Sequence, residues 1–211
     1  MIENYIKISS GHWYQETLTA PLMDYSASYS QTRYDTYKTN EPMSNLRYNL
    51  LVETIGEFNS ICDFGYGNGS FMKKCLQSGH TVYGYDISDY PVPEGTHKLD
   101  NLDEQKLDVI TFFDSLEHIS SKNLSLFLQK LDTKHICVSV PWFHESQGSN
   151  WFVNWKHRRE NEHLHHFDVH GLINLLLQSG YYIRHVGNNE DKIRTPATDL
   201  PNILTVIATK K

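Results

Sequence analysis

The amino-acid sequence predicts an α/β fold: a mainly parallel seven-stranded sheet with helices on both faces, forming a three-layer sandwich. Two observations support this prediction. From residue 60 onward, short β-rich runs alternate with amphipathic helical segments, a pattern typical of parallel strands joined by helical crossovers. The last two runs follow each other without a helix between them, so they predict an antiparallel strand at the C-terminus.

The seven expected strands share a short apolar or β-branched composition. They are residues 60–64, 81–85, a weak run at 97–99, 109–113, 136–140, 181–186 and 203–208. The last two are expected to pair antiparallel at one edge. The intervening stretch after Pro141, up to Phe167, shows no regular period and predicts a long loop of the kind that compact domains keep mainly for function.

The expected helices are marked by residues that start and stop them. The first is capped by Ser44 and ends at Gly56, and two more cover residues 70–78 and 123–131. Asp168 caps the last helix, Phe167 and Leu172 form a hydrophobic staple across that cap, and the helix closes before a glycine at 180.

The chain has 211 residues, which suits one domain with an appendage. We expect residues 1–43 to form an N-terminal arm or lid and residues 44–211 to form the main domain. The arm is rich in tyrosine, including Tyr25, Tyr29, Tyr34 and Tyr37, and has little apolar period. It is therefore expected to pack on the domain through aromatic rings rather than to contribute core.

Composition narrows the classes of function. A formal net charge of −6 disfavours nucleic acid as a partner, because phosphate binding depends on Lys and Arg, and the basic cluster at residues 156–159 stands alone. No apolar run is long enough for a membrane span, and the N-terminus lacks a leader pattern, so we expect a cytoplasmic protein. Cys62, Cys75 and Cys137 have no metal-type spacing and are expected to be buried thiols.

A glycine-rich turn follows the first expected strand. Residues 63–69 read Asp-Phe-Gly-Tyr-Gly-Asn-Gly, with glycines at Gly65, Gly67 and Gly69. Such a turn lets a ligand approach the backbone closely. A dinucleotide fingerprint would place its third glycine at residue 70, which is a serine here. The leading Asp63 suits a cofactor that carries an ammonium and a sulfonium, whereas it would repel a pyrophosphate.

Asp86 follows the second expected strand, a little over twenty residues beyond Asp63. An acidic residue at that place accepts hydrogen bonds from both ribose hydroxyls of a nucleotide cofactor. We therefore expect Asp86, with Ile87 beside it, to bind the ribose side of the cofactor.

With these residues in view, the chain resembles a small class I S-adenosylmethionine-dependent methyltransferase with a Rossmann-like fold. The resemblance rests on the glycine turn, on Asp86, and on the stretch from Asp108 to Ile119, which contains a Glu117-His118-Ile119 triplet. It covers about residues 46–211, including a His-x-x-His-Phe-like stretch at residues 162–167 before the last helix. It implies S-adenosyl-L-methionine as the cofactor and methyl transfer as the activity.

The resemblance also assigns further residues to the cofactor. Asp114, Ser115 and Leu116 are implied as walls around its methionine and adenine parts. Tyr66 departs from the pattern, because relatives more often carry a small residue or Cys there. No motif identifies the acidic residue that would contact the adenine. Asp100 is our candidate, and the alternative is that Asp100 is an ordinary loop carboxylate with no role in binding.

The acceptor side of the site is less determined. Direct displacement from a sulfonium requires no particular catalytic residue, because orientation in a dry pocket supplies much of the acceleration. If a general base is used, His118, His163 and His166 are the candidates, with His165 beside them. No metal is expected, since the histidines lack Cys or acidic partners in sequence. The aromatic residues at 142, 143, 151, 152 and 155 would either line the acceptor pocket or hold the arm down.

Three functions remain open at this level. The first is methyl transfer to an O, N or C atom of a small-molecule acceptor. The second is a catalytically silent S-adenosylmethionine-binding partner protein, and the third is a nucleic-acid-modifying methyltransferase acting on a single-stranded or flipped base. The sequence indicates neither the acceptor nor the oligomeric state.

The glycine turn generates a direct binding prediction. S-adenosylmethionine and S-adenosylhomocysteine should bind with roughly micromolar dissociation constants, whereas NAD should not bind, because Asp63 would repel its pyrophosphate. Isothermal calorimetry with each ligand measures this difference. Comparable affinity for NAD would contradict the cofactor assignment.

Overall fold

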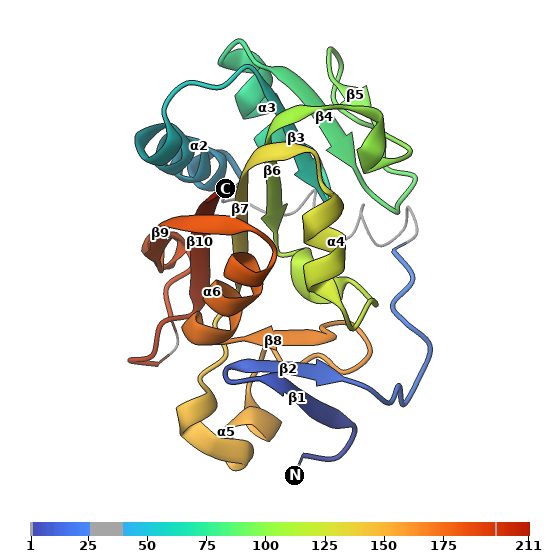
Figure 1. Cartoon of the computed structure of the whole chain (residues 1–211), viewed down its shortest axis with the longest axis vertical. Helices are drawn as coiled ribbons and strands as arrows, with labels where there is room; N and C mark the ends of the chain where they lie inside the picture. The colour runs from blue at the N-terminus through green and yellow to red at the C-terminus, as the bar shows by residue number, and fades with distance from the viewer. Residues whose placement is uncertain (1, 26–39, 197) are drawn as a thin grey trace.

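The computed structural model describes residues 2–25, 40–196 and 198–211, which form two sheets and the helices around them (Figure 1). Tyr29, Tyr34 and Tyr37 of the expected arm lie outside the described residues. The large sheet has seven strands, and a small sheet of three strands lies beyond one end of it.

The large sheet has the predicted mainly parallel order. Its strands run, from edge to edge, β5 (His97–Lys98), β4 (Thr81–Tyr85), β3 (Ser60–Phe64), β6 (Leu107–Phe113), β7 (Thr133–Pro141), β10 (Ile203–Lys210) and β9 (Tyr181–Gly187). The first five strands pair in parallel. β10 inserts antiparallel between β7 and β9. The predicted fold class is confirmed.

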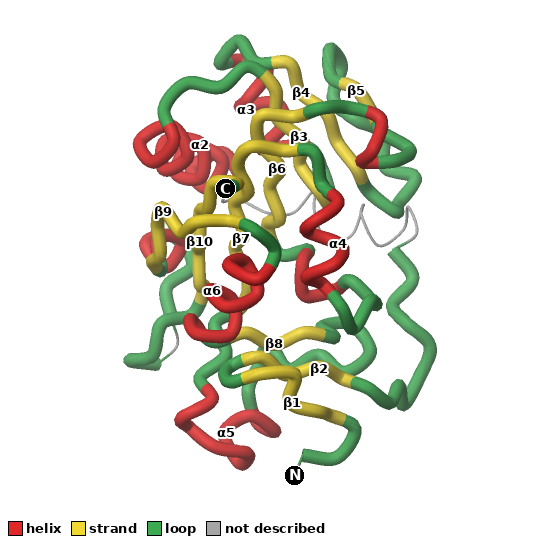
Figure 2. Tube along the Cα trace, in the orientation of Figure 1, coloured by secondary structure: helices red, strands yellow, loops and turns green. Residues whose placement is uncertain are grey.

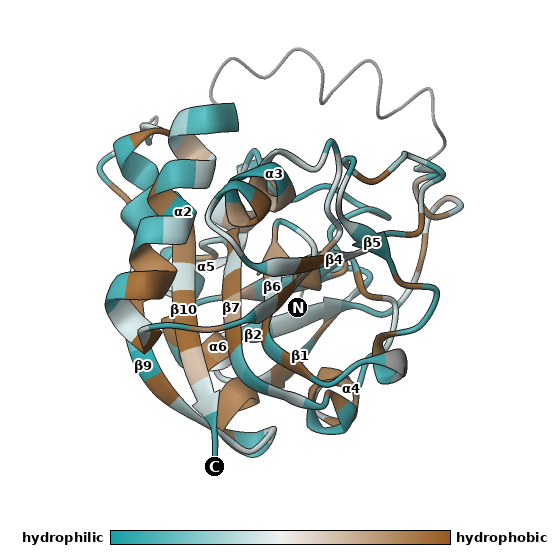
Figure 3. Cartoon of the chain, turned by 90° about the horizontal axis from the view of Figure 1, so that it is seen from above, coloured by the Kyte–Doolittle hydropathy of each residue, from teal (hydrophilic) through white to brown (hydrophobic). Residues whose placement is uncertain are grey.

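Helices cover both faces of this sheet because its central strands bury side chains on both sides. Along β6, Val109 and Phe113 pack in one apolar cluster and Ile110 and Phe112 in another. The cluster with Val109 and Phe113 includes residues of α2 (Asn40–Ile55) and α3 (Ser70–Gln77), whereas the other includes residues of α4 (Leu124–Lys130) and α6 (Val169–Gln178). Figure 3 shows the apolar central strands between helices whose outer sides are polar.

The helix termini follow the predicted signals in one case and depart from them in another. The Asp168 side chain accepts a hydrogen bond from the Gly171 N–H at 2.9 Å and so caps α6. The cap expected at Ser44 was wrong, because α2 begins at Asn40 and the Ser44 hydroxyl donates to the Asn40 carbonyl inside the helix. Pro42 lies in the first turn of α2, where proline is tolerated.

The expected arm contains regular structure, and the prediction of a long irregular loop after Pro141 needs correction. The N-terminal residues form a hairpin of β1 (Tyr5–Ser9) and β2 (His12–Gln15), and the stretch after Pro141 contains α5 (Gly148–Asn154) and β8 (His165–Phe167). β2 pairs antiparallel with β8, so segments about 150 residues apart share the small sheet (Figure 2). The short 3-10 turns are η1 (Leu102–Glu104), η2 (Leu116–His118), η3 (Glu145–Gln147) and η4 (Asn189–Lys192).

An aromatic cluster fastens the hairpin to this stretch. Tyr5, Phe143 and Phe152 are buried together, and three tryptophans, Trp13, Trp151 and Trp155, pack around them. The Tyr5 and Phe152 rings meet edge to face at 5.1 Å, a favourable arrangement for aromatic pairs. Of the two roles left open for these aromatic residues, the structure supports the one in which they hold the arm down.

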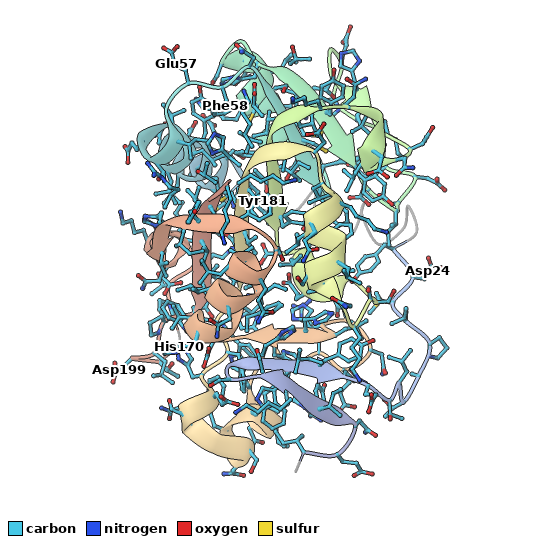
Figure 4. All side chains as sticks on the ribbon, in the orientation of Figure 1. Asp24, Glu57, Phe58, His170, Tyr181 and Asp199 are labelled. Atoms are coloured by element: carbon cyan, nitrogen blue, oxygen red, sulfur yellow. The ribbon has the colours of Figure 1, made fainter. Side chains whose placement is uncertain are left out.

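Buried polar side chains complete the attachment. His12 Nε2 lies 2.9 Å from His165 Nδ1, so one ring donates to the other across the β2–β8 pair. A Cβ atom on Gly171 would lie 2.1 Å from the Gly11 carbonyl oxygen, which shows how closely α6 approaches the hairpin turn. At the other end of α6, the buried Tyr181, labelled in Figure 4, donates to the Leu128 carbonyl.

All three cysteines are buried and free, as expected. Within the described ranges, no helix is both long and apolar enough to cross a bilayer.

The buried histidines predict that the fold loses stability in acid. Burial lowers the pKa of His12 and His166 to about 3 and of His165 to about 4, whereas unfolded histidines titrate near 6.5. Between these values the unfolded chain binds more protons, so the free energy of unfolding falls as the pH drops below about 6.5. Urea unfolding at pH values from 7.5 to 4.5 measures the slope.

Replacing His166 by Phe isolates one of these contributions. His166 Nε2 is buried with no hydrogen-bond partner among the described residues, so an aromatic ring of similar size should be tolerated. The slope of the free energy of unfolding against pH should then decrease by about 1.4 kcal/mol per pH unit, because one proton fewer is taken up on unfolding. His170→Gln is the control, because His170 is exposed at the start of α6 (Figure 4). An unchanged slope in His166→Phe would contradict this account.

Candidate functional site

A cavity of about 980 Å³ opens at the carboxyl ends of β3, β4 and β6. This is where open α/β sheets place their ligands, because connections that leave neighbouring strands toward opposite faces of the sheet open a crevice there. The turn after β3 forms one wall, and η2 with residues 156–163 forms the opposite one. Leu22, Met23 and Tyr25 of the N-terminal segment line it as well.

The turn after β3 needs glycine for reasons of backbone conformation and space. Gly65, Gly67 and Gly69 have φ angles of 76°, 53° and 69°, in the left-handed region that favours glycine. A Cβ atom on Gly65 would lie 2.7 Å from the Ser115 Cβ. The glycines therefore keep the backbone open where it meets the end of β6.

Asp86 organises this turn from the end of β4. Its Oδ2 accepts a hydrogen bond from the Gly67 N–H at 3.0 Å, and its Oδ1 accepts one from the Ser88 N–H at 2.8 Å. A carboxylate offers about four acceptor positions, so two remain for a ligand. Both Asp86 and Ile87 line the cavity.

Asp63 lies deeper, at the floor of the cavity. Burial raises its pKa to about 7, although a hydrogen bond from the Thr111 hydroxyl at 2.8 Å stabilises its ionised form. A cationic group placed beside Asp63 would favour ionisation, as the predicted role toward an ammonium requires.

The structure brings most of the predicted cofactor residues to the cavity and leaves three away from it. The residues that line it are Asp63, Gly65, Tyr66, Gly67, Asp86, Ile87, Asp114 and Ser115. Gly69 does not line it and packs against Pro93, and Leu116 is a core residue. Asp100 is exposed outside the cavity, whose lining includes the neighbouring Asn101 and Asp103 instead.

Two features of the cavity fit a cofactor such as S-adenosylmethionine. The Ser115 hydroxyl is buried and has no hydrogen-bond partner within the described part of the chain, so it can bind a polar ligand atom. Beside it, the glycine turn leaves space for a ligand, which side chains at the glycine positions would occupy. Asp63, Asp86 and Ser115 would hold the polar groups of the cofactor, which supplies the methyl group when bound.

Asp114 serves a structural purpose that the sequence did not indicate. It has a φ of 53°, and its carboxylate accepts hydrogen bonds from Arg194 at 2.6 and 2.8 Å and from Arg47 at 3.2 Å. Burial alone would raise the pKa of Asp114, but the Arg194 guanidinium holds it well below its usual range. Glu190, 1% exposed, accepts two further bonds from Arg47.

These arginines were not predicted as site residues. Arg47 is on α2, Glu190 is on η4 and Arg194 follows η4, so they meet only after the sheet brings their elements together. Arg47 also stacks over the Phe113 ring at 4.1 Å. No short motif links residues so far apart, so the sequence carried no signal for this group.

The predicted catalytic histidines fall into two sets. His118 and His163 both line the cavity, with ring centroids 4.7 Å apart. His166 instead lies among the rings of Tyr5, Phe152 and Trp155, outside the cavity lining. His165 is likewise bonded to His12 away from the cavity.

Glu117 joins His118 and His163 at the cavity wall. It is 1% exposed, and burial raises the pKa of its carboxyl well above the ordinary value. Burial lowers the pKa of both imidazoles, which keeps them neutral near pH 7. A neutral imidazole beside a cavity can accept a proton or bind a metal ion.

The basic cluster also faces the cavity in large part. Lys156, His157 and Arg159 line it, whereas Arg158 pairs with Glu160. Arg159 pairs with Glu162 at 3.1 Å. This wall of the cavity is therefore largely polar.

The comparison with protein families identifies the chain. A methyltransferase domain family matches residues 34–186, more than half of the 211 residues. The chain belongs to this methyltransferase domain family. Its identification as a class I S-adenosylmethionine-dependent methyltransferase is confirmed by this match and by the fold. No curated protein matches the chain in sequence.

Solved structures of other methyltransferases share this fold. Magnesium protoporphyrin IX methyltransferase from Synechocystis PCC 6803, with bound S-adenosylhomocysteine, is 17% identical with a TM-score of 0.57, over 82% of this chain and 83% of that one. The 1,6-didemethyltoxoflavin-N1-methyltransferase of Burkholderia thailandensis, with its acceptor and S-adenosylhomocysteine, is 16% identical with a TM-score of 0.61, over 99% of each chain.

The position of Asp86 in this methyltransferase predicts its effect on binding. Asp86→Ala should weaken S-adenosylhomocysteine binding by about 1.5–3 kcal/mol, because hydrogen bonds to a charged group are lost. Calorimetry measures the change, with Asp89→Ala as the control, since Asp89 is exposed three residues away. Equal affinities of the two variants would place the ribose contact elsewhere.

Proposed function

We propose that this chain transfers a methyl group from S-adenosylmethionine to an O, N or C atom of a small molecule. The observation that supports it best is the continuity of one cavity from the glycine turn to His118 and His163. Its volume, about 980 Å³, is at the upper end of the range of about 300–1,000 Å³ for ligand pockets. It therefore has room for a cofactor and a small acceptor together.

The cofactor side of the proposal rests on groups already placed. Asp86 would accept hydrogen bonds from the ribose hydroxyls, Asp63 would balance the ammonium, and Ser115 would use its unpartnered hydroxyl. When bound, S-adenosylmethionine supplies an electrophilic methyl group on a sulfonium. In both solved relatives described above, S-adenosylhomocysteine is bound to a protein of this fold.

The acceptor would lie against the opposite wall. Lys156 and Arg159 provide positive charge there, while Leu22 and Met23 provide apolar surface. This combination suits a partly apolar small molecule with polar substituents. We propose that the segment before residue 44 acts as a lid on this acceptor, because Tyr25 already contacts the wall through a 2.8 Å hydrogen bond to His118.

An acceptor that must lose a proton would lose it at the same wall. His163 is the favoured base, because its neutral ring lines the cavity, whereas Nδ1 of His118 is already bonded to Tyr25 and to the Glu162 carbonyl. Base catalysis typically supplies about 10²–10⁴-fold in rate. His118 is the alternative. We place this activity in the cytoplasm, which the three free cysteines support.

The test is product formation. The protein should convert S-adenosylmethionine labelled with deuterium in its methyl group into S-adenosylhomocysteine and a labelled acceptor, when supplied with a panel of small hydroxylated and amino compounds. Mass spectrometry detects the labelled product. His163→Asn should lower turnover by about 10²–10⁴-fold and leave S-adenosylhomocysteine affinity unchanged.

The control for that variant is His170→Asn, at the exposed start of α6. Tight S-adenosylhomocysteine binding without labelled product from any compound would favour a silent partner protein. Labelling of single-stranded RNA or DNA, and of no small molecule, would favour a nucleic-acid-modifying methyltransferase.

A further inference from the structure

The carboxyl group of Glu117 lacks the partners that buried carboxyls normally have. It is 1% exposed, and neither of its oxygens has a hydrogen-bond partner among the described residues. A buried carboxyl without a partner is unfavourable whether it is ionised or protonated, because it loses its bonds to water. Since Glu117 lines the cavity, a ligand in the cavity can supply the missing partner.

Two imidazoles flank this carboxyl group. The Nε2 atom of His118 lies 4.0 Å from Glu117 Oε1, and one ligand atom from each of Glu117, His118 and His163 lies within 4.8 Å of the others. Donor atoms bound to one ion at about 2.1 Å are separated by about 3.4 Å in a tetrahedron. A small side-chain adjustment would therefore bring all three onto one ion.

The orientation of His118 is already that of a metal ligand. Its Nδ1 lies 2.9 Å from the Glu162 carbonyl oxygen and 2.8 Å from the Tyr25 hydroxyl. A carbonyl can only accept, so Nδ1 carries the proton and the hydroxyl oxygen accepts from it as well. The Nε2 lone pair is then free on the side of Glu117. Metal-binding histidines commonly have their second nitrogen held in this way.

We infer that Glu117, His118 and His163 bind one divalent transition-metal ion at the acceptor wall of the cavity. Two imidazoles and one carboxylate suit Zn²⁺, Co²⁺ or Fe²⁺ better than Mg²⁺ or Ca²⁺, which prefer oxygen ligands. Asp114 is not a further ligand, because Arg47 and Arg194 hold its carboxylate. The sequence predicted no metal because no acidic partner of the histidines was recognised, and Glu117 is that partner.

A site with three protein ligands keeps at least one position open. Because Glu117, His118 and His163 all line the cavity, an ion that they held would be accessible from it and would lower the pKa of an acceptor hydroxyl, whose proton would pass to water. The acceptor class is accordingly a hydroxyl compound. The assignment of a hydroxyl acceptor rests on the proposed function, and in it the ion takes the place of His163 as the group that promotes deprotonation. Binding of the metal ion does not depend on the proposed function.

The experiment titrates the untagged, metal-free chain with Zn²⁺ alone and with Co²⁺ alone, without any cofactor. We expect one ion per chain, and binding of Mg²⁺ and Ca²⁺ at least about 100-fold weaker. Glu117→Gln and His163→Asn should each weaken Zn²⁺ binding by at least about 100-fold, since loss of an outer partner alone costs about 10–100-fold. His157→Gln is the matched control, because His157 lines the same cavity outside the trio.

X-ray absorption of the unmodified chain with Zn²⁺ needs no variant, and it should show two imidazoles around the ion. Absence of stoichiometric binding, or equal binding by Glu117→Gln and His157→Gln, would overturn the inference. S-adenosylhomocysteine binding, measured on the same preparations, separates the two proposals. In the unmodified chain, absence of S-adenosylhomocysteine binding alone would count against the proposed function, and absence of stoichiometric Zn²⁺ binding alone would count against the metal site.

Discussion

Parallel pairing of β3, β4 and β6 constrains the rest of the molecule, because it brings the carboxyl ends of three strands to one edge. Asp63, Asp86 and Asp114 lie at or just beyond those ends, so three carboxyl groups line one cavity. Each of these carboxyl groups has different partners, and the division of roles in the site follows from that difference.

Asp114 is neutralised by Arg47 and Arg194, and the pairs join α2, the end of β6 and the segment after η4. Asp63 is buried and accepts a hydrogen bond from the Thr111 hydroxyl; burial raises its pKa, and a cationic ligand can lower it again. Asp86 is bonded to backbone N–H groups and keeps acceptor positions for a ligand. The ionic group around Asp114 thus supports the site, while Asp63 and Asp86 remain available to a cofactor.

The second sheet produces a similar division among the histidines. β2 and β8 bury His12, His165 and His166 between aromatic rings, where their neutral form stabilises the fold. The same segment, just before β8, delivers His163 to the cavity beside His118. The pairing of β2 with β8 therefore connects this wall of the cavity to the N-terminal hairpin. Histidines that are close in sequence thus have different surroundings, aromatic rings for the first group and the cavity for the second.

The sequence by itself determined the alternation of strands and helices, the glycine turn and the acids at the ends of β3 and β4, because these depend on period and on local backbone demands. Tertiary structure decided the partners of Asp114, the placement of Asp100 and His166 outside the cavity, and the pairing of β2 with β8. Arg47, Glu190 and Glu117 acquire their surroundings only when distant elements meet. Burial and charge pairing are properties of the assembled chain, so no local pattern in the sequence specifies them.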